Sequence, residues 1–102
     1  MKLIKDLSCM IEEEICDAEQ YAREAVLEKD QHPALARTYY QLAEEELGHA
    51  DRLHTQVVSL IDEYKRNNGA PPEAMQAVYD YLHERQIEKV ARVKVMLAEF
   101  KG

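Results

Sequence analysis

The chain has 102 residues and a formal net charge of −7, which fits one domain with a shallow core. Surplus acid argues against broad binding to nucleic-acid phosphates, because that needs Lys and Arg gathered on one face. No apolar run approaches the roughly 18 residues of a membrane span, and no signal peptide is recognised. We therefore expect a single cytoplasmic domain over residues 1–102 that binds neither nucleic acid nor membrane.

Two breaks divide the sequence into three long helices. The run at 30–33 places a proline in the first turn of a new helix. In the run at 67–72, Asn-Gly ends one helix and a proline starts the next. The rest is rich in helix-forming residues and shows no strand-like alternation. We predict an all-α protein with antiparallel helices at about 3–29, 33–67 and 72–100.

The helix predicted at 3–29 has one apolar stripe whose steps alternate between three and four residues, as expected for packing in a bundle. The stripe comprises Ile4, Leu7, Ile11, Glu14, Ala18, Tyr21 and Ala25. Glu14 is its one charged member. A carboxylate at a core position costs several kcal/mol unless it is paired or bound to a metal ion.

The helix predicted at 33–67 has a similar stripe with two adjacent polar members. The stripe comprises Leu35, Tyr39, Leu42, Glu46, His49, Leu53, Val57, Leu60 and Tyr64. Glu46 and His49 form a Glu-x-x-His pair, which we expect to be buried along the stripe. His54 falls off the stripe and is predicted to be exposed.

The helix predicted at 72–100 carries two stripes. The main stripe comprises Met75, Val78, Leu82, Gln86, Val90, Val93, Leu97 and Phe100. The second comprises Ala77, Tyr81, Glu84, Glu88, Ala91, Val95 and Ala98. His83, Glu84 and Glu88 could add metal ligands or face solvent or a partner, and the sequence leaves these roles open.

Glu14 and Glu46 are predicted to lie at a similar level of the bundle. Glu14 is about 17 residues before the turn near residue 31 and Glu46 is about 15 after it. Carboxylates with one imidazole per metal suit iron or manganese, and zinc also fits. Two Glu and one His are half of the ligands of a di-iron carboxylate centre, so a two-fold dimer would complete it.

Two runs of sequence, within about half the chain, resemble the ferritin-like superfamily. Residues 14–21 place Tyr21 seven residues after Glu14, and residues 43–50 resemble the rubrerythrin run that ends in Glu-x-x-His-Ala. The resemblance implies that Glu14, Glu46 and His49 are iron ligands and that Tyr21 lies just outside them. Glu13 and Asp17, one step and one turn from Glu14, could attract incoming Fe²⁺.

The short chain with a single Glu-x-x-His is most similar to the encapsulated ferritins. Those are two-helix half-ferritins that dimerise to form a ferroxidase centre and assemble into rings. The resemblance implies a homodimer or a larger even-numbered homo-oligomer and an encapsulin shell as partner. No encapsulin-targeting tail is recognised after Phe100, and the helix predicted at 72–100 has no assigned counterpart in the family.

Two functions from different classes follow from these patterns. The first is a di-iron ferroxidase or iron-handling protein, in which oxygen or peroxide oxidises Fe²⁺ at the Glu/His cluster. The second is a non-catalytic helical interaction module whose metal is structural or absent. The second stripe of the helix at 72–100 motivates this alternative, because a partner could cover it.

Overall fold

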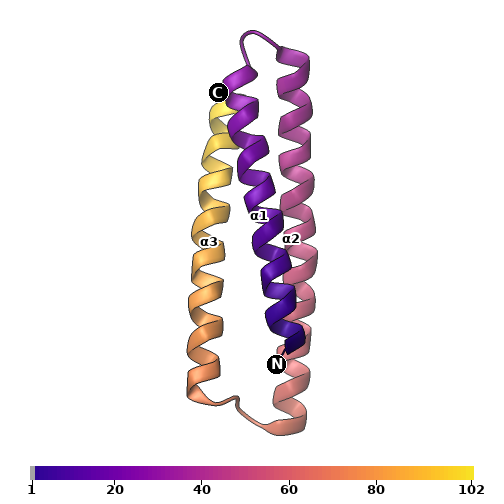
Figure 1. Cartoon of the computed structure of the whole chain (residues 1–102), viewed down its shortest axis with the longest axis vertical. Helices are drawn as coiled ribbons and strands as arrows, with labels where there is room; N and C mark the ends of the chain where they lie inside the picture. The colour runs from indigo at the N-terminus through magenta and orange to yellow at the C-terminus, as the bar shows by residue number, and fades with distance from the viewer. Residues whose placement is uncertain (1) are drawn as a thin grey trace.

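Three long helices make up the described part of the chain, residues 2–102 (Figure 1). In this computed structural model, α1 spans Lys2–Glu28, α2 spans Pro33–Asn68 and α3 spans Glu73–Lys101. The predicted all-α fold with three helices is confirmed. The molecule extends 55 × 18 × 18 Å, and its length matches the about 54 Å expected for the 36 residues of α2. Within residues 2–102, no helix has an apolar stretch long enough to cross a membrane.

Proline and glycine set the ends of the helices as the sequence predicts, and each predicted end lies within one residue of the observed one. Pro33 lies in the first turn of α2. Backbone N–H groups there have no partner within the helix, so proline loses no hydrogen bond by lacking one. Gly69 ends α2 with a φ of 79°, and its N–H donates to the carbonyl of Lys65 at 2.9 Å. This positive φ favours glycine, so the Asn-Gly pair fixes where the chain turns toward α3.

The first helix lies between the other two and packs along both of them, whereas α2 and α3 contact each other little (Figure 1). The buried residues of α1 are Ile4, Ser8, Ile11, Ile15, Ala18, Ala22 and Ala25. Those of α2 are Ala36, Ala43 and Ala50, and those of α3 are Gln86, Val93 and Leu97. The core is therefore built around α1, and the α1–α2 interface consists largely of alanine.

The prediction that Glu46 and His49 lie in the buried stripe of the second helix is wrong. Glu46 is half-buried and His49 is exposed, rather than both being buried. Three alanines spaced seven apart form the buried stripe instead, and Ala50 is only about 100° around the helix from His49. Because alanine lets α1 approach closely, the larger side chains on either side border the contact rather than fill it. Leu35 is accordingly 43 % exposed.

The stripes predicted for the third helix are also only partly in the core. Val78, from the main stripe, is 56 % exposed, and the whole second stripe is exposed. Only the part of α3 from Gln86 to Leu97 contributes fully buried residues, because there it faces α1.

A polar contact joins α3 to α1 within this core. The side-chain amide of Gln86 donates to the Ser8 hydroxyl at 3.1 Å and approaches the Ser8 carbonyl at 3.5 Å. Both residues are buried. A buried amide that loses its partner costs more than the hydrogen bond itself contributes, so this pair fixes how α3 sits on α1.

Replacing Ser8 with Ala should lower the free energy of unfolding by about 1–2 kcal/mol, because the Gln86 amide keeps only its longer contact. The double variant Ser8→Ala/Gln86→Leu should recover most of this loss, because no buried donor is left. Chemical denaturation followed by circular dichroism measures both. Gln41→Leu, at an exposed site on α2, is the control and should change the free energy by less than about 0.5 kcal/mol.

Candidate metal centre

Glu14 from α1 and Glu46 and His49 from α2 converge at one place on the α1–α2 hairpin. Each offers one ligand atom, and these atoms lie within 4.8 Å of one another. Within residues 2–102 this is the only group of three or more His, Cys, Asp or Glu side chains so arranged. The structure thus brings together the three residues named from the sequence, and their role as iron ligands remains a prediction.

The cluster is partly open to solvent. The Nδ1 atom of His49 lies 3.5 Å from Glu14 Oε2 and 3.8 Å from Glu46 Oε2. The side chains of Glu46, Glu14 and His49 are 19 %, 29 % and 50 % exposed. These separations exceed those of strong hydrogen bonds. They are close to those of two atoms that each lie about 2.1 Å from one shared ion.

The pKa of Glu46 is raised from 4.5 to about 7. The largest cause is a hydrogen bond with Glu14, which the protonated form of Glu46 donates, and burial and the charge of Glu14 add to it. The charge of Asp17 raises this pKa further, whereas His49 lowers it. Below about pH 7 Glu46 therefore tends to keep its proton, because two charged carboxylates this close repel one another.

This donor set fits a divalent cation. Two carboxylates and one imidazole suit Fe²⁺ or Mn²⁺, and Zn²⁺ is also compatible. The raised pKa of Glu46 indicates a site that favours positive charge, and a bound cation would displace the Glu46 proton. Glu14, Glu46 and His49 are the residues that would hold the ion.

The remaining residues that the sequence suggested for the site do not belong to the three-residue cluster. Tyr21 is two turns along α1 from Glu14, and its ring stacks on Tyr39 with centroids 6.2 Å apart. Asp17 is exposed and near enough for its charge to affect Glu46, and Glu13 is also exposed. On α3, both Glu84 and Glu88 are exposed and take no part in the cluster.

Sequence reasoning missed a pair of imidazoles on the opposite side of α2. His54 was predicted to be exposed, but it is half-buried, and its ring lies against that of His83. His54 follows the buried Ala50 by four residues and so shares its face of the helix. That spacing is the signal that could have placed it, had the alanine stripe been recognised as the core.

The cluster lies on the flank of the hairpin that faces away from α3. Ile15, which lines the gap between α2 and α3, is about 100° around α1 from Glu14. No residue of α3 is among the groups that set the pKa of Glu46. The α1–α2 hairpin therefore forms the cluster without help from α3.

Comparison of the chain with protein-family models, with curated proteins and with solved structures finds no match. The similarity to the ferritin-like superfamily therefore rests on the motifs at 14–21 and 43–50.

The raised pKa of Glu46 makes the stability of the metal-free protein depend on pH. Between about 4.5 and 7 the folded protein binds more protons than the unfolded chain, so stability falls as the pH rises. Because of Glu46, the free energy of unfolding should be lower at pH 8 than at pH 4.5 by on the order of 2 kcal/mol, allowing for solvent screening. Urea denaturation across this range measures the slope.

The matched pair Glu46→Gln and Glu45→Gln isolates this effect, because Glu45 is the exposed neighbour on the same helix. Glu46→Gln should flatten the slope and stabilise the metal-free protein at pH 8. Glu45→Gln should leave the wild-type profile intact. Identical profiles for the two variants would contradict the raised pKa of Glu46.

Proposed function

We propose that this protein is a ferritin-like iron-handling protein that oxidises Fe²⁺ at a site shared between two protomers. The convergence of Glu14, Glu46 and His49 on one flank of the hairpin is the observation that carries the proposal. Fe²⁺ is the substrate, and each ion gives one electron to dioxygen or peroxide. Two carboxylates stabilise the ferric product because they add negative charge beside the higher charge of Fe³⁺.

The residues of the chain have separate tasks in this proposal. Glu14 and Glu46 bind the substrate ion, and Glu46 gives up its proton as the ion arrives. His49, the most exposed of the three, adds a nitrogen ligand at the mouth of the site. Asp17 and Glu13 are exposed nearby and draw cations toward it through their charge.

Exposed apolar side chains around the cluster support a dimer across this flank. Met10 and Leu3 precede Glu14 by four and eleven residues, so they share its face of α1, and they are 49 % and 59 % exposed. Leu35 precedes Glu46 by eleven residues and is 43 % exposed. Because the helices are antiparallel, apolar groups lie on both sides of the cluster, and a second copy could cover them and bring a second set of ligands.

The second candidate function is a non-catalytic interaction module. Four large apolar side chains on α3 support it, and each is between 55 % and 60 % exposed. They are Val78, Tyr81, Ile87 and Val95. If the module holds no metal, Fe²⁺ would give the protein no stability against unfolding, whereas a substrate site at Glu46 would give stability that rises with Fe²⁺ concentration. If its metal is structural, Fe²⁺ would stabilise the protein without being oxidised.

Substituting the cluster residues tests the oxidation of iron. Glu46→Gln and His49→Gln should each reduce Fe²⁺ oxidation to the rate seen without protein, because the substrate loses a ligand. Oxygen consumption after anaerobic Fe²⁺ loading measures the rate. Glu45→Gln and His32→Gln, at exposed positions, should keep the wild-type rate. Wild-type rates in both cluster variants would rule out this site.

Substituting an exposed apolar residue tests whether two chains share the site. The wild type should be a dimer or larger even assembly with about one iron per chain. Met10→Lys should give monomers that oxidise iron poorly, because a charge then lies beside the cluster. Leu27→Lys is the matched control, since Leu27 is 66 % exposed and lies about 140° around α1 from Glu14 and more than three turns further along the helix. Sedimentation velocity and iron analysis measure both. Equal mass and iron content for the two variants would contradict the shared site.

A further inference from the structure

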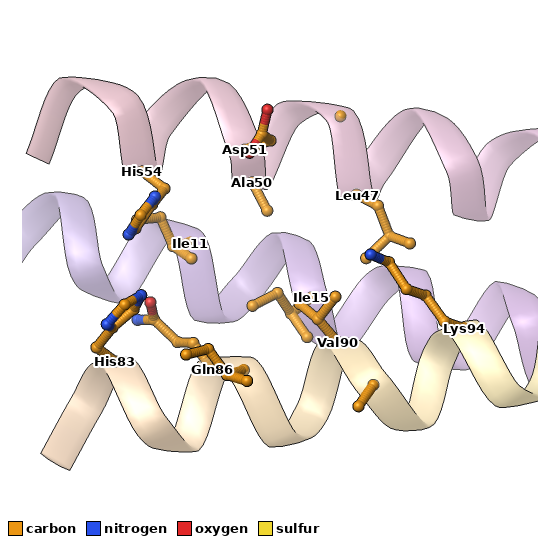
Figure 2. Close-up of a pocket in the computed structure, with 13 residues that line it drawn as sticks. Ile11, Ile15, Leu47, Ala50, Asp51, His54, His83, Gln86, Val90 and Lys94 are labelled. Atoms are coloured by element: carbon orange, nitrogen blue, oxygen red, sulfur yellow. The ribbon is translucent and has the colours of Figure 1, made fainter. Parts of the chain in front are cut away.

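Two imidazoles face each other across the gap between α2 and α3. The ring centroids of His54 and His83 are 4.9 Å apart, and their planes differ by 14°. Figure 2 shows the two rings pointing toward one another, each from its own helix. Elsewhere α2 and α3 touch little, so this pair is one of the few links between them.

The pair lies between two cavities. The larger has a volume of about 580 Å³ and is bordered by Ile11 and Ile15 of α1, which form its floor (Figure 2). The smaller, of about 170 Å³, extends toward Ile4 and also borders both rings. Both imidazoles are therefore reachable from solvent along the gap, and most of their surroundings are apolar.

Neither ring has a polar partner in the protein. Within residues 2–102, no side-chain hydrogen bond or ion pair involves either His54 or His83. A neutral imidazole keeps one nitrogen lone pair free to accept a proton or bind a metal ion. In the stacked arrangement the lone pairs lie in nearly parallel planes, so the rings must turn about their side-chain bonds before both nitrogens reach one ion. Two such nitrogens from separate helices are then the donor pair that Zn²⁺, Ni²⁺ and Cu²⁺ prefer over harder cations.

We propose that His54 and His83 bind a divalent transition ion of the Zn²⁺ class, which ties α3 to α2. Water completes the coordination within the adjoining cavities. Asp51 and Asp80 each precede one of the two histidines by one turn and line the gap. Lys94 also lines the larger cavity, but the two carboxylates outnumber this one ammonium group, so the charge of the lining favours a cation. Asp80 is engaged with the amide of Gln76 at 2.9 Å and is not needed as a ligand.

This site is separate from the cluster of Glu14, Glu46 and His49. His54 follows His49 by five residues, which places it about 140° around α2 on another face. Its donors are nitrogens rather than carboxylate oxygens, so the two sites prefer different ions. The inference does not rest on iron oxidation, and either proposal can fail without the other.

The test uses the full chain with the first cluster removed by Glu46→Gln and His49→Gln. Isothermal titration with Zn²⁺ should give one bound ion per chain. Saturating Zn²⁺ should raise the melting temperature by several degrees, since the ion binds only the folded state. Adding His83→Phe keeps a ring for stacking but removes both nitrogens. It should weaken Zn²⁺ affinity by about tenfold or more and abolish the thermal shift.

A matched control separates this site from adventitious binding to surface histidines. His32 is exposed and pairs with Glu28 at the turn between α1 and α2, so His32→Phe should leave Zn²⁺ binding unchanged. His54→Asn supplies a second test of the same ligand pair and should weaken binding as His83→Phe does. Undiminished Zn²⁺ affinity in either His54→Asn or His83→Phe would show that the histidines only stack. The same conclusion would follow if Zn²⁺ did not raise the melting temperature of the Glu46→Gln/His49→Gln protein that keeps both histidines.

Discussion

The structure depends on α1 packing against both of the other helices at once. At its middle, Ala18 and Ala22 are completely buried together with Ala43 of α2 and Val93 of α3. Small side chains on both sides let the helices approach closely there, so many short dispersion contacts form. Nearer the N-terminus of α1, the buried Ile11 and Ile15 pack against Ala50 and Leu53 of α2. Because α1 occupies the centre, α2 and α3 stand apart, and the gap between them and the outer flank of the hairpin both stay open.

The position of the carboxylates follows from this arrangement. Full burial of Glu14 and Glu46 beside each other would cost several kcal/mol, because each charge would lose water and repel the other. At the edge of the alanine interface both keep some contact with solvent, and the remaining repulsion raises the pKa of Glu46, so that this carboxyl keeps its proton more readily. The same balance suits a metal site, since a cation relieves the repulsion more completely than a proton does.

The sequence was sufficient to predict the three helices and the height along the bundle at which Glu14 and Glu46 meet. It did not predict which face of α2 and α3 is buried. Proline and glycine mark the breaks, and residue counts from the turn place Glu14 opposite Glu46. The core of α2 was harder to predict, because a stripe through Leu35 and Leu42 has the same period as the alanine stripe beside it. Apolar periodicity favours the larger side chains, whereas close helix packing selects the smaller ones.

The contact between His54 and His83 could not be predicted for a different reason. It depends on how α3 is placed relative to α2, and these two helices have almost no interface of their own to encode that placement. Their relation is set indirectly, through the separate packing of each on α1. Local patterns in the sequence describe each helix and its nearest partner, and they carry little information about such second-neighbour contacts.

The placement of α3 also bears on how a two-metal centre could form. Such a centre needs about twice the ligands that Glu14, Glu46 and His49 provide. Within residues 2–102, no acidic residue of α3 joins the cluster, because α3 packs on the other side of α1. If the protein forms the two-metal centre proposed above, the second ligand set would have to come from another chain. A two-fold axis through the flank would supply it, because each copy presents the same half-site to the other.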